Sequence, residues 1–239
     1  MDQVLIGAKP LRSVGKGRLV GSAPVEARAG ALAKQAQRDA DGTRSKILAA
    51  AAAEFAQKGF AGARVDAIAR ASGANKRMIY YYFASKEGLY TAVLERAYRD
   101  MRDSEMALAL DHLEPLDGIR KLAEFKFDYY VENPMTIALL NGENMLDAHY
   151  LKGSDRLREM HATLVLTIGR LLKRGVRQGA VRRGVDPLHL YISISALSYF
   201  YFSNAPTLST AFGRKLATAA ENKLRRKHVV EVILAYLRA

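Results

Sequence analysis

Residues 65–83 read VDAIARASGANKRMIYYYF, and this stretch is the most informative about the fold. Its apolar residues recur at the helical period on both sides of a short break, which predicts helices at 65–72 and 76–83. Gly73 suits the turn because glycine adopts a left-handed backbone without a Cβ penalty. Asn75 is a favourable N-cap for the second helix. Two short helices joined in this way have the spacing of a helix-turn-helix.

The second of these helices opens with two cations, Lys76 and Arg77. Positive charge at a helix N-terminus opposes the helix dipole, at a cost of about 0.3–1 kcal/mol for each cation. The helix accepts this cost more readily if its first turn meets phosphates and base edges in a DNA major groove. Three tyrosines follow at 80–82, and a tyrosine hydroxyl can donate to a phosphate oxygen. The same spacing also occurs in ordinary helical bundles, where such a charge pair is simply solvated.

Helical periodicity continues on both sides of this stretch. Thr43 is a suitable N-cap for a helix that ends at Gly59, and Ser85 is a suitable N-cap for a long helix reaching Leu110. Beyond it, prolines near expected helix starts and apolar periodicity predict helices at 115–132, 134–144, 155–177, 187–202 and 222–237. No convincing run of alternating strand residues appears, so the predicted fold class is all-α.

The charge of the chain favours a polyanionic partner. Its 239 residues carry 37 basic and 24 acidic side chains, a net charge of +13. Residues 43–102 are the most basic part, with 11 basic and 5 acidic side chains. Such a balance suits nucleic acid or an anionic membrane surface. Residues 1–40 mix Gly, Ala, Pro, Lys and Arg without sustained periodicity, which predicts a flexible basic arm, either a solvated tail or a segment that touches phosphates or a minor groove.

Several functional classes are excluded or disfavoured by the composition. The absence of cysteine removes disulfides, thiol catalysis and iron–sulfur clusters, and no pair of histidines has the spacing of a zinc site. No phosphate-binding glycine loop, nucleophile elbow or compelling carboxylate pair is present, so we expect neither an enzyme nor a cofactor. No stretch of about eighteen apolar residues could span a membrane. We therefore expect a cytoplasmic protein with no membrane partner.

Three motifs support a more specific assignment. They are Ile47-Leu48-x-x-Ala51-x-x-x-Phe55-x-x-x-Gly59-Phe60, Val65-x-x-Ile68-Ala69-x-x-x-Gly73 and Ile79-Tyr80-Tyr81-Tyr82-Phe83-x-Ser85-Lys86-Glu87-x-Leu89. With them, residues 44–102 resemble the DNA-binding domain of TetR/AcrR-type transcriptional regulators. The resemblance implies a three-helix helix-turn-helix domain at 41–102 and a larger helical ligand-binding and dimerisation domain at 103–239.

The same resemblance implies a function. We expect a transcriptional regulator, normally a repressor, that binds double-stranded DNA at a palindromic operator as a homodimer and is released by a small-molecule effector. An activator of the same fold and a non-specific nucleic-acid-binding protein are the alternatives. Residues 132–152, with Glu132-Asn133-Pro134, Glu143-Asn144 and His149-Tyr150-Leu151-Lys152, are also similar to the pyrimidine-utilisation repressor subgroup.

The resemblance carries over to a set of candidate DNA contacts, namely Arg64, Lys76, Arg77, Met78, Tyr80, Tyr82 and Lys86. Arg64 departs from the family, which usually has Thr or Ser there, so a hydroxyl N-cap is lost. Arg77 can pair with guanine through two hydrogen bonds and specify sequence. Lys86 should add affinity for any duplex. Tyr81 and Phe83 are expected in the core of the domain.

Aromatic and polar residues suggest an effector pocket in the second domain. Aromatic residues crowd 125–130, and polar residues interrupt the apolar run 137–146, which is the mixture a small-molecule pocket needs. The candidate effector contacts are Phe125, Tyr129, Asn141, Asn144 and His149. Each of these residues also fits an ordinary core or surface position.

The helices at 187–202 and 222–237 are apolar on more than one face, which a surface helix cannot sustain. They therefore predict a four-helix dimer interface, unless both are buried within a monomer. The candidate interface residues are Tyr191, Ile194, Leu197, Phe202, Val229, Ile233 and Tyr236. A two-fold dimer would place two recognition helices about 34–36 Å apart, one turn of DNA.

Overall fold

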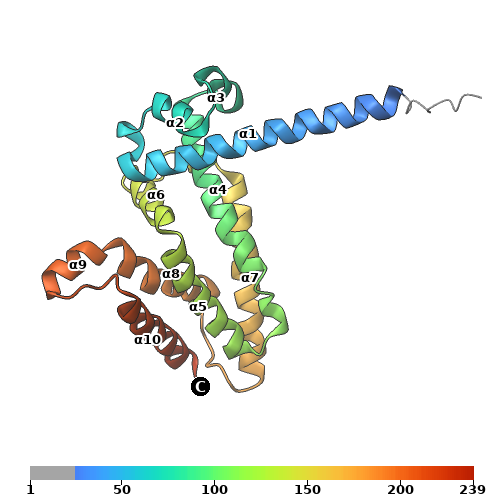
Figure 1. The fold of residues 1–239 in the computed structure, drawn as a ribbon. Coiled ribbons are helices and arrows are strands. Elements are labelled where there is room, and N and C mark those ends of the chain that lie inside the picture. The colour runs from blue at the N-terminus through green and yellow to red at the C-terminus, as the bar shows by residue number, and fades with distance from the viewer. Residues whose placement is uncertain (1–24) are drawn as a thin grey trace, which may run out of the picture. The chain divides into compact units, whose positions relative to one another are not determined.

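The computed structural model describes residues 25–239, which form α-helices, one short 3₁₀ helix and connecting turns (Figure 1). The chain divides into two units between Asp41 and Gly42, and the arrangement described here is that of Gly42–Ala239. The elements are α1 (Val25–Gly62), α2 (Val65–Ser72), α3 (Lys76–Phe83), α4 (Lys86–Met106), η1 (Leu110–His112), α5 (Pro115–Glu132), α6 (Pro134–Asn144), α7 (Asp155–Arg177), α8 (Pro187–Ser203), α9 (Ala205–Phe212) and α10 (Ala219–Leu237). The all-α fold class is confirmed.

Most predicted helix bounds agree with the structure, but two short elements were missed. Helices α2, α3, α5, α6 and α7 have the predicted ends, and α8 and α10 differ slightly from theirs. Neither α9 nor η1 was predicted from the sequence. Helix α4 ends at Met106, short of the predicted Leu110, because the chain turns at Ala109, whose φ is 51°.

The predicted start of the first helix at Thr43 is wrong, since α1 begins at Val25. Residues 31–38 read ALAKQAQR, and all of these residue types are strong helix formers. Gln35 donates to Asp39 at 3.0 Å, an interaction one turn apart that supports this part of α1. The predicted flexible arm at 1–40 is therefore helical over 25–40, and its residues 1–24 lie outside the described part of the chain. Gly59, the predicted helix end, does interrupt α1, with φ 66°.

A first core joins the end of α1 to α2, α3 and α4. Ile47 and Phe55 of α1, Ile68 of α2, Ile79 of α3 and Leu89 of α4 are all buried in it. Leu139 and Leu151, which follow much later in the chain, complete the same cluster. Helices α1 to α4 are therefore packed directly against the segment that contains α6.

A second core is built around α5, which packs against α7, α8 and α10. Ile119 and Leu122 of α5, Leu171 of α7 and Leu190 of α8 are buried in it. Helix α4 extends beyond the first core, where it packs against α7 (Figure 1). In the described residues, no helix has the length and apolarity needed to cross a bilayer.

Candidate nucleic-acid interface and buried pocket

The turn between α2 and α3 has the predicted geometry. Gly73 adopts the left-handed conformation, with φ 69° and ψ 11°. The Asn75 side chain caps α3, since its Oδ1 accepts the backbone N–H of Met78 at 2.9 Å. Ile79 and Phe83 are buried beneath α3, which fixes one face of the helix on the core. The opposite face and the first turn of α3 therefore point away from the core.

The N-terminal turn of α3 presents its cations to solvent. Lys76 and Arg77 are exposed, and Met78 beside them is half-buried. Lys76 Nζ lies 2.6 Å from Asp66 Oδ1 of α2, and this hydrogen bond holds the pKa of Asp66 below its usual range. The ion pair orients α3 against α2. Among the described residues, Arg77 has no ion pair or side-chain hydrogen bond, so its guanidinium is available for a nucleic-acid partner.

The three tyrosines of α3 face different surroundings. Tyr80 is 46% exposed, as a DNA contact requires, whereas Tyr82 is half-buried against the first core. Tyr81 is 83% exposed, so its predicted place in the core is wrong. The inward face of α3 is occupied by Ile79 and Phe83, and Tyr81 lies outside that face. The ring of Tyr81 packs edge-on against the ring of Tyr82, with ring centres 5.3 Å apart.

Arg64 and Lys86 flank the helix pair. Arg64 is the N-cap residue of α2 and is exposed, and its side chain makes no capping hydrogen bond. Its backbone N–H instead donates to Glu54 at 3.1 Å. Lys86 is the first residue of α4, and its Nζ lies 4.9 Å from the centre of the Phe60 ring. Ser85 caps the same helix by accepting the N–H of Gly88 at 3.1 Å.

A cluster of buried charges lies where α4 meets α5. Arg102 and Glu105 of α4 and Lys126 of α5 have side chains that are at most 3% exposed. Glu105 bridges the two cations, with 2.6 Å from its Oε2 to Arg102 Nη1 and 2.9 Å from its Oε1 to Lys126 Nζ. One carboxylate thus faces two cations. Burial of a charge is expensive, and the contacts with Glu105 offset that cost for both cations.

A pocket of about 270 Å³ opens beside these cations, between α4, α5, α6, α7 and α8. Arg102 donates from Nη2 to the Tyr191 hydroxyl at 2.8 Å, and Lys126 Nζ lies 5.3 Å from the centre of the Tyr191 ring. The other lining side chains are mostly aromatic or apolar. The pocket is lined by Tyr98, Met101, Arg102, Lys126, Tyr130, Leu140, Asn144, His161, Tyr191, Ile192, Ser195, Ala196 and Tyr199.

His161 adds an uncharged polar group to this pocket. Its Nδ1 lies 2.8 Å from the Leu157 carbonyl, and a carbonyl only accepts, so Nδ1 carries the proton. Burial lowers the pKa of His161, which keeps the ring neutral at neutral pH. The remaining nitrogen, Nε2, is therefore a hydrogen-bond acceptor. Burial also raises the pKa of Tyr98 to about 12, so this hydroxyl stays protonated.

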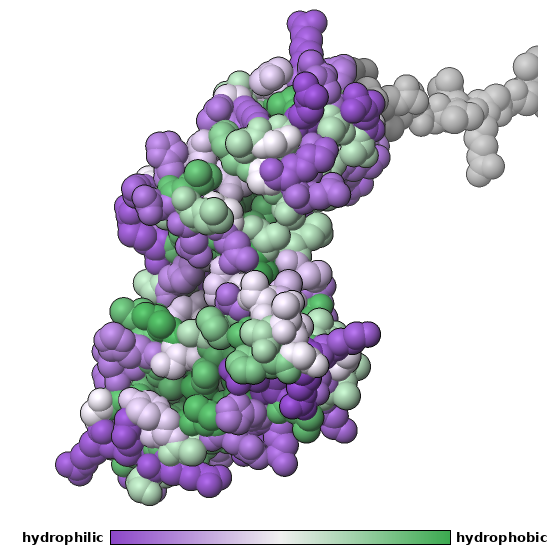
Figure 2. All heavy atoms as spheres, turned by 90° about the vertical axis from the view of Figure 1, so that its left-hand side faces the viewer, coloured by the Kyte–Doolittle hydropathy of each residue, from purple (hydrophilic) through white to green (hydrophobic). Residues whose placement is uncertain are grey.

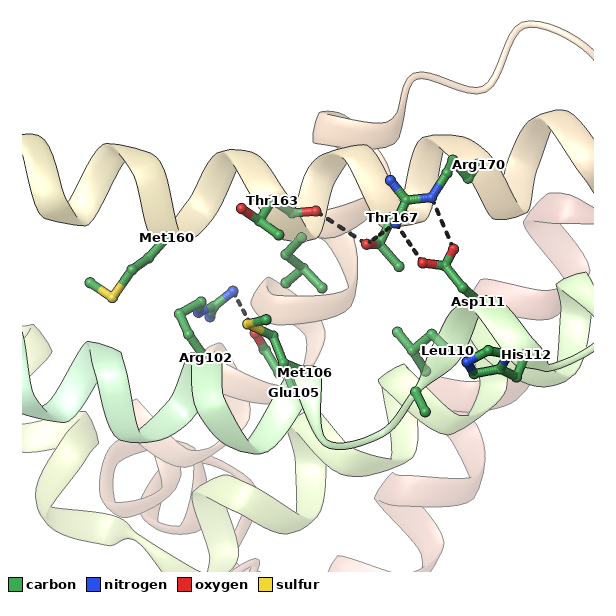
Figure 3. A pocket seen from close by; sticks show the side chains of 12 residues that line it. Arg102, Glu105, Met106, Leu110, Asp111, His112, Met160, Thr163, Thr167 and Arg170 are labelled. Carbon is green, nitrogen blue, oxygen red and sulfur yellow. Dashed lines mark hydrogen bonds and ion pairs between the residues drawn. The ribbon is translucent and has the colours of Figure 1, made fainter.

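A second hollow, of about 340 Å³, lies between the end of α4, η1 and α7 (Figure 3). Arg102 and Glu105 line it from α4, while Met160, Thr163 and Thr167 line it from α7 (Figure 3). Asp111 and Arg170 close one end through two hydrogen bonds, at 3.0 and 2.5 Å. Arg170 holds the pKa of Asp111 below its usual range. Arg102 therefore belongs to the walls of both hollows.

Comparison with known proteins assigns both halves of the chain. Residues 47–93 match the family model for bacterial regulatory proteins of the tetR family. Residues 115–233 match the tetracyclin repressor-like C-terminal domain. The chain belongs to the TetR family. It is thus a DNA-binding transcriptional regulator, and α3 is the recognition helix of its helix-turn-helix.

Individual relatives agree with this assignment. The transcriptional repressor NicS of Pseudomonas putida is 38% identical over 178 residues, which cover 74% of this chain and 84% of NicS. The transcriptional regulator RutR of Escherichia coli K12 is 31% identical over 170 residues, covering 71% and 78% of the two chains. The crystal structure of SCO4942 from Streptomyces coelicolor superposes with a TM-score of 0.63 at 26% identity, covering 82% and 98%. These TetR-family relatives are regulators rather than enzymes.

The predicted effector contacts of this TetR-family regulator are only partly gathered at the pocket. Asn144 lines it, and Asn141 lies nearby, where it accepts the Tyr199 hydroxyl. Phe125 and Tyr129 pack against each other, with ring centres 5.6 Å apart, and do not line it. His149 is exposed and contacts the ring of Tyr150, which places it away from the lining residues.

Arg102 and Lys126, the charged residues of the pocket, were not predicted from the sequence. Lys126 stands between Phe125 and Phe127 in a helix whose neighbouring turns are apolar, and that isolated charge was the available signal. Tyr191, predicted at the dimer interface, instead directs its hydroxyl to Arg102. The two cations come from different helices, and only the fold brings them together.

Several residues predicted at the dimer interface are buried within the single chain instead. Ile194, Val229 and Ile233 are at most 2% exposed within the single chain, so they cannot meet a partner in this conformation. Phe202 packs on Phe127, with ring centres 4.9 Å apart. Leu197 is half-buried, and Tyr236 is 46% exposed. Because α8 and α10 are apolar nearly all round, the sequence did not reveal which face turns inward.

Other residues of the same helices form an outward apolar face. They are Leu188, Ile192 and Phe200 of α8 and Leu224, Val232 and Tyr236 of α10. Figure 2 views the side on which α8 and α10 lie in Figure 1, and hydrophobic side chains gather over its lower part. Apolar patches of this kind on one side of a domain are typical of protein–protein interfaces.

Proposed function

We propose that this TetR-family regulator is a repressor that binds a palindromic operator as a homodimer and releases it when a small molecule occupies the second domain. The observation that carries the proposal is the outward-facing first turn of α3, where Lys76 and Arg77 stand exposed on a helix fixed by Asn75. The relative NicS, itself described as a transcriptional repressor, supports repression over activation.

The outward apolar face of α8 and α10 supports the homodimer. An isologous interface buries the same patch on both subunits, and a closed two-fold pair then presents two copies of α3 in opposite directions. Helix-turn-helix dimers read half-sites about 34–36 Å apart. The operator is therefore expected to be a palindrome with half-sites one turn of DNA apart.

Helix α4 provides the connection between DNA and ligand. Its first turn carries Lys86 beside the DNA-binding domain, and Arg102 stands in the wall of the pocket about 24 Å further along the helix. Leu89 packs in the same core as Phe83 of α3, so movement of α4 is transmitted to the recognition helix. A ligand that favours one position of α4 shifts the dimer toward a state whose recognition helices no longer match the operator.

The direct test is selection of duplexes from a random pool by the full-length protein, followed by titration of the selected and scrambled duplexes at several salt concentrations. The proposal predicts a palindromic consensus that binds at least a thousandfold tighter than scrambled DNA. Equal affinity for all duplexes, with a steep salt dependence, would instead identify a non-specific binder. A promoter carrying the consensus distinguishes repression from activation.

A further inference from the structure

We propose that the end of α7 and the segment between α7 and α8 form a docking site for an acidic stretch of a partner protein. In this site, one apolar side chain of the partner enters a hollow, and carboxylates on either side of it meet cations that line the hollow. The inference goes beyond the proposed function, because it requires neither operator DNA nor a small molecule. It can therefore be tested with the full-length protein alone.

The hollow lies where the last turns of α7 face the segment that leads into α8. Its volume of about 410 Å³ falls in the range of about 300–1,000 Å³ that ligand sites span. Leu172 is buried, and Val176, Val185 and Pro187 are half-buried, so an apolar side chain placed among them is removed from water. The hollow is lined by Gly169, Leu172, Lys173, Val176, Arg177, Arg182, Arg183, Gly184, Val185 and Pro187.

Four exposed cations line the hollow together with these apolar residues, and no carboxylate lines it. They are Lys173 and Arg177 of α7 and Arg182 and Arg183 of the following segment. Among the described residues, none of these four side chains makes an ion pair or a side-chain hydrogen bond. Asp186, the acidic residue nearest to them in the chain, is the N-cap of α8 and accepts the N–H of His189. The charge of the hollow therefore favours an acidic partner.

Arg182 is held in place by the C-terminal end of α10. Its backbone N–H donates to the Leu237 carbonyl at 2.9 Å, and its guanidinium carbon lies 3.8 Å from the centre of the Tyr236 ring. A guanidinium that is already fixed over an aromatic ring loses less conformational freedom when it meets a carboxylate. This cation is therefore preorganised for an acidic side chain.

Gly169 leaves room in the hollow. It lies in the interior of α7, where glycine destabilises a helix relative to alanine. A Cβ at this position would have only Pro187 within 4 Å, with the nearest atom at 3.8 Å, which is ordinary van der Waals contact. Packing within the chain therefore does not require glycine at 169. The missing side chain instead leaves space for a side chain from another protein.

The form of the site favours a peptide over nucleic acid or a membrane. A DNA duplex presents phosphates on a convex surface and has no flexible apolar side chain to enter a hollow. A membrane is bound by apolar side chains that protrude, whereas here they form a recess. The hollow is also distant from the first core, which Leu157 contacts near the start of α7, because Lys173 follows Leu157 by about 24 Å along the same helix.

The first experiment is calorimetric titration of the full-length protein at physiological salt with the acetylated and amidated peptide EEDLDEE. The matched peptides are EEDSDEE, which lacks the apolar side chain, and KKRLRKK, which reverses the charge. We expect the first peptide to bind at least about tenfold tighter than the second, because a leucine side chain is buried, and the third to show no binding. Equal binding of the first two peptides, binding of the third, or no binding of the first would overturn the inference. The last result is also the one expected if a second copy of the chain covers the hollow.

Two double variants separate local contacts from the general attraction of a basic protein. Lys173→Gln with Arg177→Gln removes two cations from the hollow and should lower the affinity for EEDLDEE about five- to tenfold. Lys152→Gln with Arg156→Gln removes the same two residue types, also four positions apart, from exposed positions at the other end of α7. This control loses the same net charge and should bind as the unaltered chain does. Equal losses from both double variants would overturn the inference.

A third variant fills the hollow and keeps all four cations. Gly169→Leu adds a side chain where a Cβ is tolerated, and it should lower the affinity for EEDLDEE at least about tenfold. Unchanged affinity would show that the peptide does not enter the hollow. If a variant fails to fold, the ratio of EEDLDEE to EEDSDEE affinity in the unaltered chain still decides the question.

Competition identifies the class of partner. A scrambled duplex and vesicles of phosphatidylglycerol are each added to the complex with EEDLDEE, and neither should displace the peptide. A duplex bound at α3 does not act on the hollow through its charge, since the screening length at physiological salt is about 8 Å. Displacement by the duplex or by the vesicles would assign the hollow to nucleic acid or to a membrane surface and overturn the inference.

Discussion

Lys126 Nζ lies 2.9 Å from Glu105 Oε1, and both side chains are 1% exposed. This ion pair joins α5 to α4, the helix that continues into the DNA-binding domain. Glu105 also holds Arg102, so a single carboxylate fixes both cations. The pair is therefore a buried structural contact between these two helices.

Removal of Glu105 should destabilise the chain far more than removal of Lys126. Glu105→Ala leaves two buried cations without a counter-charge, at a cost of about 3–5 kcal/mol. Lys126→Met leaves a neutral pair and should cost less. Urea unfolding of both variants measures the difference, with Asp117→Ala, at an exposed position of α5, as a control within about 0.5 kcal/mol of the unaltered chain. Equal losses from Glu105→Ala and Lys126→Met would show that the excess charge is not buried.

Arg77 and Lys86 should contribute differently to DNA binding. Arg77→Ala should relax the preference at one base position by about 1–3 kcal/mol, because a paired contact to guanine is lost. Lys86→Ala should weaken all duplexes alike and lower the slope of log affinity against log salt by about one. Fluorescence titrations with matched and scrambled duplexes distinguish the two effects. A uniform loss for Arg77→Ala, or lost discrimination for Lys86→Ala, would reverse the assignments.

Dimerisation should depend on the outward face of α8. Phe200 is 55% exposed in the single chain, so Phe200→Asp should break the dimer without disturbing the core. Phe212→Asp changes a residue of α9 that is 73% exposed and serves as the matched control. Sedimentation velocity at micromolar concentration should show a monomer for the first variant and a dimer for the second. Two dimers would place the interface elsewhere.

The stability of the chain should fall in mild acid because of His161. Burial lowers the pKa of its ring from an ordinary value of 6.5, so the unfolded chain takes up the proton more readily than the folded chain. The contribution of the neutral His161 ring to stability is therefore complete above a pH of about 6.5. It is lost as the pH falls toward the pKa of His161 in the folded chain. Urea unfolding between about pH 7.5 and 5.5 measures it. His161→Gln should flatten part of this dependence, and an unchanged slope would assign it to other groups.

Local signals in the sequence were sufficient for much of the fold. Gly73, Asn75 and Ser85 act through their nearest neighbours, and the turn and caps that they predict are present. The start of α1 was missed because Thr43 is a suitable N-cap that a continuous helix does not need. Helix α9 was missed, although Pro206 fits the first turn of a helix.

The candidate sites were harder to predict because they depend on packing between distant segments. Tyr81 and Phe83 look alike in sequence, and only the rotation of α3 on its core separates them. Ile194 and Phe200 lie on one apolar helix, and neighbouring helices decide which of them is covered. Arg102, Lys126 and Tyr191 are far apart in the chain and meet only through the folding of α4, α5 and α8.

In the proposed complex, a dimer presents two copies of α3 to one duplex. Insertion of half a turn of DNA, about five base pairs, between the half-sites of the selected operator tests this arrangement. We expect affinity to fall to that of scrambled DNA, because the second recognition helix then faces the wrong side of the duplex. Undiminished affinity for the altered operator would contradict it, since each half-site would then be read independently.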